Sequence, residues 1–382
     1  MAIIDSDQHL YESRSLWLDH SDPSMRDDAL RIEDDRTGTP WLRWREQRLG
    51  IAEVQVPGRS AEVGERHRRA RAGLPSLERY DDALPRDYWE PRARLTKLAE
   101  LGVDEGVLFP NYGLLWERRL HQSLRALLAN MAAWNRWCAT VAQEGGGRLH
   151  PVAHLTLRDP SWLEAQLAAL SRADVRLALI APALVDGRPL SHRAHDRMWA
   201  AFCDHGITPL FHVAEQPRVF ADAWYTDEAE AFVPALEAVF LHIPAALACS
   251  DLILNGTLER FPNLRLGIVE LSAIWVPLYL MMLDGASAFT RQISGAETPP
   301  LPLAPSDYFR RQVRVSSFAY EDPAGIVQQL GGTDLLMCCS DYPHSEGTTT
   351  PMLDYAASGL DVRAGASPGL FSNNIAFLLR RG

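Results

Sequence analysis

Short apolar segments alternate with helical segments along most of this 382-residue chain. From Arg92 onward, each short apolar run follows a longer segment in which apolar residues recur at every third or fourth position. The first pattern predicts a buried strand and the second an amphipathic helix. Parallel strands need a long crossover connection, which a helix supplies, so this alternation predicts a parallel α/β sheet.

The pattern predicts eight strands, which cover the stretch 3–12 and residues 105–110, 150–157, 176–183, 208–215, 264–271, 311–318 and 334–343. The helices between them are predicted at 92–102, 116–144, 161–172, 195–205, 245–260, 273–290 and 322–330, with Ser161 as the N-cap of the third. This order predicts a (β/α)8 TIM barrel, whose active site lies at the C-terminal ends of the strands. A doubly wound open sheet is the alternative, but no GxGxxG turn follows the first strand.

Residues 17–92 break the alternation directly after the first strand. The segment is rich in Asp, Arg, Pro and Trp, and we expect a small inserted subdomain, or lid, within a single barrel domain that spans residues 1–382. The alternating stretches PWLRWREQRLG and IAEVQV, residues 40–56, predict an antiparallel pair of strands. The charged run 59–73 predicts a mobile loop.

Acidic and imidazole side chains stand at the C-terminal ends of four predicted strands. They are Asp7 and His9 in the first strand, His212 in LFHVAE, Glu270 in IVEL, and Asp341 with His344 in CCSDYPHSEG. Alone, each has an ordinary structural explanation, as a hydrogen-bonded histidine or a helix-capping carboxylate. Together they indicate a site, because apolar strands rarely run into buried charge without a partner. Imidazole nitrogen and carboxylate oxygen suit Zn²⁺, Mn²⁺ or Fe²⁺.

Four stretches carry a resemblance to a known family: DSDQHLYE, LFHVAE, LERFPNLRLGIVELSAIWVP and SDYPHSEG. In their order and spacing the chain resembles the amidohydrolase superfamily. Within it, the chain is similar to the amidohydrolase-related branch that includes aminocarboxymuconate-semialdehyde decarboxylase and the resorcylate and carboxyvanillate decarboxylases. The resemblance covers nearly the whole chain and implies a metal-dependent enzyme on a TIM barrel.

The resemblance also implies roles for individual residues. Asp7, His9, His212 and Asp341 fall on metal-ligand positions, and the catalytic roles fall on Asp341, His344 and Glu270. The chain departs from the family pattern at Asp7, where relatives have histidine or glutamate, and at Glu270, where many have histidine. One divalent ion is expected, with Zn²⁺ ranked first and Mn²⁺ or Fe²⁺ as alternatives.

The lysine content restricts the chemistry. Lys97 is the only lysine in the chain, and it lies in a predicted helix. A two-metal centre bridged by a carboxylated lysine on the fourth strand is therefore excluded, as is a Schiff-base mechanism. Decarboxylation of a small aromatic or unsaturated carboxylic acid is the first hypothesis. A metal-dependent hydrolase of an amide, lactone or C–C bond is the second, and a barrel that only binds ligands is the third.

The remaining expectations concern partners and location. A net charge of −11 argues against a nucleic-acid partner, and no apolar run of membrane-spanning length or signal peptide is recognised. Five scattered cysteines indicate a reduced, cytoplasmic protein. We expect a small-molecule substrate and a homodimer or higher homo-oligomer. Weaker candidates for contact with the substrate are His121, His150, His154, His242, Tyr112 and Trp116.

Overall fold

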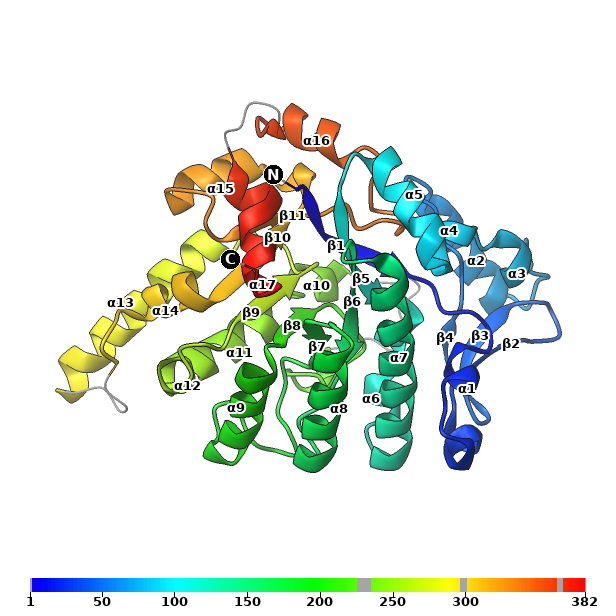
Figure 1. Cartoon of the computed structure of the whole chain (residues 1–382), viewed down its shortest axis with the longest axis horizontal. Helices are drawn as coiled ribbons and strands as arrows, with labels where there is room; N and C mark the ends of the chain where they lie inside the picture. The colour runs from blue at the N-terminus through cyan, green and yellow to red at the C-terminus, as the bar shows by residue number, and fades with distance from the viewer. Residues whose placement is uncertain (1, 225–234, 296–300, 363–366, 382) are drawn as a thin grey trace.

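Eight parallel strands form one sheet whose order follows the chain from β1 to β11 (Figure 1). A computed structural model describes residues 2–224, 235–295, 301–362 and 367–381. The strands are β1 (Ile4–Leu10), β5 (Glu105–Pro110), β6 (Leu149–His154), β7 (Leu177–Leu179), β8 (Thr208–His212), β9 (Leu266–Val269), β10 (Val313–Ser317) and β11 (Leu336–Cys338). Each lies in a region where the sequence predicts a strand.

The sheet closes on itself just beyond the end of β11. Gln8 forms a parallel bridge with Tyr342. The amide of His9 donates to the carbonyl of Tyr342 at 2.7 Å, and the amide of Asp341 donates to the carbonyl of Asp7 at 2.9 Å. These bonds join the first strand to the chain that follows the last one. The predicted (β/α)8 TIM barrel is confirmed.

Helices connect the strands and pack around the sheet (Figure 1). Those of the barrel are α5 (Pro91–Leu101), α6 (Glu117–Leu120), α7 (Leu124–Gly145), α8 (Pro160–Arg172), α9 (Asp196–His205), α10 (Ala235–Val239), α11 (Ile243–Leu254), α12 (Thr257–Arg260), α13 (Val276–Ser294), α14 (Pro305–Gln312), α15 (Pro323–Leu330), α16 (Pro351–Ala357) and α17 (Asn374–Leu378). Gly102 ends α5 in a left-handed conformation, as the sequence predicts.

Three details of the helices differ from the prediction. The predicted helix 116–144 is interrupted between α6 and α7, and the predicted helix 245–260 is interrupted at Gly256, whose φ is 73°. Ser161 is not the N-cap of α8. Asp159 occupies that position and accepts a hydrogen bond from the amide of Trp162. The helix starts one residue earlier than predicted because proline is well suited to the first helical position.

Residues 235–254 are long and apolar enough to cross a membrane by composition, with a mean hydropathy of 1.6. The sequence analysis recognised no such run. The structure divides it into α10 and α11, and Ala245, Cys249 and Leu252 on α11 are buried in the core. Packing against the barrel thus accounts for part of the apolar character of α11, whereas Leu247 on the same helix is 55% exposed.

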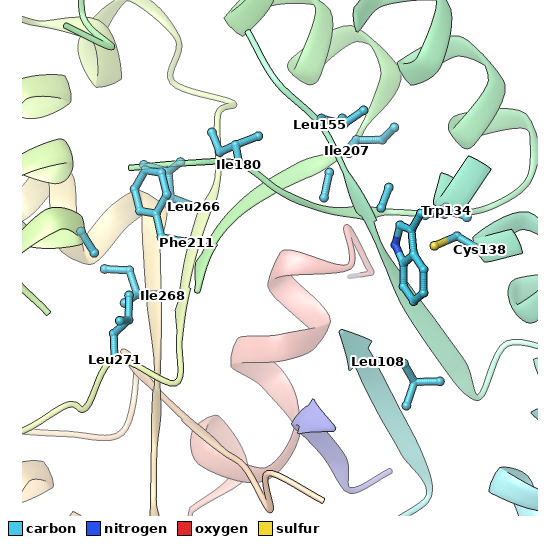
Figure 2. Close-up of a cluster of buried hydrophobic side chains, with 14 of the residues drawn as sticks. Leu108, Trp134, Cys138, Leu155, Ile180, Ile207, Phe211, Leu266, Ile268 and Leu271 are labelled. Carbon is cyan, nitrogen blue, oxygen red and sulfur yellow. The ribbon is translucent and has the colours of Figure 1, made fainter. Parts of the chain in front are cut away.

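Two apolar layers lie on the two faces of the strands. Figure 2 shows the outer layer, where Leu108, Phe211 and Ile268 pack between the strands and the helices. The neighbouring positions, such as Leu210 and Val269, belong to the interior cluster of the barrel. This alternation follows from the period-two geometry of a strand. It also turns His212 at the end of β8 toward the interior.

The N-terminal end of the barrel is closed by α17. Leu378 is completely buried in the interior cluster, and its carbonyl accepts a hydrogen bond from Thr208 Oγ1 at 2.7 Å. Asn374 Nδ2 donates to the carbonyl of Leu336 at 2.7 Å. Thr208 and Leu336 are the first residues of β8 and β11. The C-terminal helix, red in Figure 1, thus fills the end of the barrel that faces away from the predicted site.

The segment after β1 contains a three-stranded antiparallel sheet and short helices. They are α1 (Leu16–Asp19), β2 (Arg31–Asp34), β3 (Pro40–Trp44), β4 (Gln47–Ile51), α2 (Ser60–Arg71), α3 (Tyr80–Ala83) and α4 (Arg86–Trp89). The antiparallel pair predicted within 40–56 is present as β3 and β4, but the chain turns at Arg45 rather than between residues 50 and 51. The predicted loop 59–73 is wrong. It forms α2, which ion pairs such as Glu62–Arg66 and Glu65–Arg68 stabilise.

Candidate metal centre

Two histidines and an aspartate meet inside the C-terminal end of the barrel. Asp7 and His9 project from the same face of β1, and His212 is the last residue of β8. Asp7 Oδ1 lies 3.4 Å from His9 Nε2 and 3.5 Å from His212 Nε2. All three side chains are completely buried. The three groups that the sequence placed on two separate strands therefore face one point.

Two further carboxylates complete the cluster from the loops after β9 and β11. Glu270 Oε2 lies 3.0 Å from His212 Nε2, and Asp341 Oδ1 lies 3.3 Å from His9 Nε2. Both residues have left-handed backbones, with φ of 54° at Glu270 and 56° at Asp341. This conformation is unfavourable outside glycine and concentrates at functional sites. Here it accompanies the turn of both carboxylates into the barrel mouth.

The cluster contains buried polar atoms without hydrogen bonds. Apart from the ion-pair contacts within the cluster, no hydrogen-bond partner is found among the described residues for either carboxylate oxygen of Asp7 and Asp341, for Glu270 Oε2, or for Nε2 of His9 and His212. Each such group costs about 1–3 kcal/mol when it is left unsatisfied. Their contacts of 3.0–3.5 Å match neighbouring ligands of one ion, which are about 3.0–3.5 Å apart when each lies about 2.1 Å from the metal. The donor set fits a divalent cation.

The outer nitrogens of the two histidines are held by backbone carbonyls. His9 Nδ1 lies 3.0 Å from the carbonyl oxygen of Pro110, and His212 Nδ1 lies 2.8 Å from that of Val213. A carbonyl only accepts, so each Nδ1 carries a proton and each neutral ring presents the lone pair of Nε2 to the cluster. This arrangement orients metal-ligating histidines in many proteins.

The electrostatics of the cluster favour a positive charge at its centre. Burial lowers the pKa of His212, but Glu270 and Asp7 raise it by more than burial lowers it, so the pKa is about 9. The pKa of His9 is likewise lowered by burial and raised more strongly by Asp341, Asp7 and Glu270, so it ends well above its usual value. Burial raises the pKa of Glu270, but His212 lowers it to well below its usual range. Without a cation, protons on the imidazoles balance the carboxylates.

Asp341 also belongs to a second pair, with His344. His344 Nδ1 lies 2.8 Å from Asp341 Oδ1, and His344 Nε2 lies 2.8 Å from Asn111 Oδ1. The imidazole ring stacks on His9 at 3.8 Å between centroids. Burial raises the pKa of Asp341. The nearby His344 lowers this pKa, and the Glu270 carboxylate raises it. A proton shared by Asp341 and His344 relieves the contact between two electron-rich atoms, so this pair is suited to proton transfer.

The structure brings all six predicted site residues together. Glu270, to which the prediction assigned a catalytic role, lies close enough to the two histidines to be a ligand. The sequence analysis missed Asn111, which directly follows β5 and holds His344, although its place at a strand end was a usable signal. It also gave no role to Asp5. The Asp5 carboxylate accepts from the amides of Asp7 and Ser340 and so ties β1 to the loop of Asp341.

The weaker candidates lie outside the described donor cluster. His150 pairs with Glu105 at the opposite end of the barrel, at 2.6 Å. His154 is buried, pairs with Glu117 at 2.9 Å and packs against the ring of Trp116. Of the other three, the carbonyl of His121 accepts from Arg158, the hydroxyl of Tyr112 donates to the carbonyl of Glu53, and His242 stacks on Trp275.

A cavity of about 460 Å³ opens beside His212. Its wall is mostly apolar and includes Val213, Ala214, Pro217, Phe240, Leu241 and Leu271. Arg118 and Gln216 add polar groups, and Arg118 pairs with Glu215 at 2.7 Å. This volume lies within the range of about 300–1,000 Å³ that is usual for small-molecule sites. His212 is the cluster residue that lines this cavity, so a molecule bound there lies next to one edge of the cluster.

Solved structures with the same fold extend over nearly the whole chain. An amidohydrolase from Mycobacterium avium subsp. paratuberculosis K-10 aligns with a TM-score of 0.77 and 21% identity, over 99% of both chains. A 5-carboxyvanillate decarboxylase from Novosphingobium aromaticivorans DSM 12444 with bound manganese aligns with a TM-score of 0.67 and 16% identity, over 99% of this chain and 97% of its own.

A dihydroxybenzoic acid decarboxylase from Polaromonas sp. JS666, also with bound manganese, aligns with a TM-score of 0.58 and 13% identity, over 99% of this chain and 97% of its own. No protein-family model and no curated protein sequence matches the chain. At these identities the likeness shows the fold. It confirms the fold that the sequence resemblance implies.

Proposed function

We propose that this chain is a mononuclear divalent-metal enzyme that removes carbon dioxide from a small aromatic or unsaturated carboxylic acid. The observation that carries the proposal is the set of unpartnered buried donor atoms beside an apolar cavity. Two proteins of the same fold that bind manganese are named as decarboxylases of aromatic acids, which supports the same chemistry here.

We assign the ion to Asp7, His9, His212 and Asp341, with Glu270 close enough to serve as a further ligand. Three carboxylates beside two imidazoles form an oxygen-rich site, which suits Mn²⁺ better than the Zn²⁺ that the sequence analysis ranked first. The manganese of the similar decarboxylases points the same way. Fe²⁺ remains an alternative with the same donor preference.

The bound ion would hold the substrate carboxylate and a neighbouring oxygen and withdraw electrons from them. The chain itself supplies the proton. Asp341, with His344 at 2.8 Å, transfers a proton to the carbon that carries the carboxylate. The bond from that carbon to the carboxylate then breaks, carbon dioxide leaves, and the new C–H bond keeps the proton. Asn111 holds the far side of His344 during the transfer.

The cavity residues would position the apolar body of the substrate. Val213, Phe240 and Leu271 provide surface for a planar ring, and Gln216 has its amide oriented by Glu117 at 3.3 Å. Segment 17–92 would help to cover the mouth as a lid, because the amide of Gly58 donates to the carbonyl of Ser345, next to His344. The mostly apolar wall of the cavity disfavours the water that would compete for the reaction.

Hydrolysis is the alternative that a specific observation favours. One structure of the same fold is named as an amidohydrolase, and Asp341 with His344 could equally remove a proton from water. The two reactions leave different isotopes in the product. We expect a substrate from a panel of aromatic acids, incubated with Mn²⁺ in deuterated water, to release CO₂ and gain one deuterium at carbon. Solvent ¹⁸O in the organic product would instead establish hydrolysis.

The proposal extends to partners and location. The substrate is a small molecule, and neither nucleic acid nor a membrane is a partner, in line with the net charge of −11. We place the enzyme in the cytoplasm, where its five cysteines remain reduced. We also propose a homodimer or higher homo-oligomer, because a long helix keeps an apolar face exposed.

A further inference from the structure

The exposed side of α13 carries an apolar stripe opposite its buried side. At 100° per residue the exposed positions span about 120° of arc, and the buried positions lie on the other side of the helix. The exposed residues are Leu278, Met281, Met282, Phe289 and Ile293, and Ile274 precedes them in the loop. The buried ones are Val276, Leu280, Leu283 and Ser287. The C-terminal half of α13 extends beyond the neighbouring helices (Figure 1).

The stripe is larger than the apolar patches that monomers usually expose. Its six large side chains are each 61–73% exposed. At about 180 Å² for a large apolar side chain, they expose on the order of 700 Å², whereas a typical monomer's largest patch is about 300–600 Å². A standard protein interface buries about 800 Å² on each partner. One such stripe therefore suffices for most of one stable interface.

Gly285 lies in the middle of the stripe. Glycine inside a helix costs about 1 kcal/mol relative to alanine. Within the described part of the chain, nothing lies within 4 Å of a Cβ added at Gly285, and its φ is not positive. The fold of the single chain thus gives no reason for a glycine there. Close approach of a second helix at this position would give one, because a side chain would hold the two backbones apart.

The apolar residues are arranged almost symmetrically about Gly285. Met281 and Phe289 lie four residues before and after it, and Leu278 and Ile293 lie seven before and eight after. Two copies of α13 that cross antiparallel at Gly285 would place Met281 of one copy opposite Phe289 of the other, twice. A two-fold interface needs this self-complementarity. Binding of an unrelated protein would not require a symmetric arrangement.

We infer that α13 is the dimer interface of this protein, with two copies crossing antiparallel at Gly285. The inference rests on the proposed homodimer and is independent of the proposed chemistry. Charge supports a protein partner. Asp284 and Arg291 are the only charged residues between positions 274 and 295, and Asp284 bonds to Ser306 on α14. A chain with a net charge of −11 is repelled by an anionic membrane.

The test measures the mass of the full chain in solution by sedimentation, for the wild type and for Met281→Lys and Phe289→Glu separately. The wild type is expected at twice the chain mass and each variant at the single mass. A mixture of the two variants is expected to form a dimer again, because the introduced lysine of one copy meets the introduced glutamate of the other while the second pair stays Met–Phe. Leu353→Glu, at a residue 61% exposed on α16, is the matched control and should remain dimeric.

Gly285→Ala distinguishes a loss of dimer affinity from a change in helix stability. Alanine stabilises the isolated helix, so the thermal stability of the chain should not fall, while the dimer dissociation constant should rise at least tenfold. A monomeric wild type overturns the inference, and so does a variant mixture that stays monomeric. Binding of the wild-type monomer to lipid vesicles would assign the stripe to a membrane instead. Metal content is measured on every variant and tests the proposed chemistry separately.

Discussion

The two ends of the barrel satisfy their polar groups in opposite ways. At the N-terminal end, α17 fills the opening, and Thr208 and Asn374 bond to the carbonyls of Leu378 and Leu336. At the C-terminal end, the carboxylate oxygens of Asp7 and Asp341 and the Nε2 atoms of His9 and His212 face one another without hydrogen-bond partners among the described residues. One end is closed by apolar packing and by side-chain hydrogen bonds to strand and helix carbonyls. The other end holds a compact group of buried polar atoms without partners among the described residues.

This difference distinguishes residues that stabilise the fold from candidates for binding an ion or a substrate. Unsatisfied buried groups reduce the free energy of unfolding, so several of them gathered at one point indicate a bound species that satisfies them. The left-handed backbones of Glu270 and Asp341 belong to the same end. Substitutions at the two ends should therefore affect different measurements.

The largest expected effect is on metal content and activity, and a pair of substitutions at the two ends of β8 tests it. His212→Ala at the C-terminal end of β8 should lower metal content to background and activity by more than about a hundredfold, which is the upper effect of an outer-shell partner. Thr208→Val at the other end of β8 is the matched control. It removes the bond to Leu378 and should lower the melting temperature, with metal content unchanged. Full activity in His212→Ala would show that His212 is structural.

Leu378→Ala tests the closed end by itself. Its completely buried side chain fills the interior of the barrel, so truncation should lower the free energy of unfolding by about 2–5 kcal/mol. The folded fraction should keep its metal and its activity, because α17 lies at the opposite end from the cluster. Urea denaturation with metal analysis of the folded protein measures both. Loss of metal from folded Leu378→Ala would contradict the separation of the two ends.

The pH dependence of stability should change sign when metal is added. In metal-free protein the pKa of His212 is about 9, raised from 6.5, so protonation stabilises the fold. This contribution is fully present below about pH 6.5 and is lost as the pH rises through about 9, by about 3 kcal/mol at most. A metal ion binds the unprotonated ring and should stabilise more at high pH.

Melting curves with a chelator and with Mn²⁺, between about pH 6 and about pH 9, measure this effect. We expect the curve with chelator to fall over this interval and the gain from Mn²⁺ to grow. His212→Asn is the control variant, since its side chain does not titrate, and its fall in chelator should be smaller. Equal pH dependence in both proteins would mean that His212 stays neutral without metal.

The sequence predicts the strands and the cluster well because both follow from simple geometry. Residues 105–110 form β5 as predicted, since a short apolar run between turns has few alternatives. The six predicted site residues meet because C-terminal strand ends converge in a barrel. The sequence does not single out Asn111, because an asparagine after a strand is also typical of an ordinary turn.

Features that depend on charge pairs were harder to predict. The helix α2 buries only Val63 and is supported by pairs such as Glu65–Arg68, so its sequence lacks the apolar periodicity of a core helix. Glu270 is a candidate both for a catalytic role and for a metal ligand. The second role follows from the distance of 3.0 Å between its Oε2 and His212 Nε2, which no sequence pattern contains. Local pattern thus predicts the elements, and the folded geometry decides the roles.

The smallest expected effect concerns a carboxylate that lies at the functional end but outside the cluster. Asp159 follows β6 and accepts from the amide of Trp162 as the N-cap of α8. Asp159→Ala should lower the free energy of unfolding by about 1 kcal/mol, with metal content and activity unchanged. Ser161→Ala, at the N-cap that the sequence suggested, should change it by less than about 0.5 kcal/mol. A larger loss from Ser161→Ala than from Asp159→Ala would contradict the observed cap. Loss of metal from Asp159→Ala would extend the functional set beyond the residues that face the cluster.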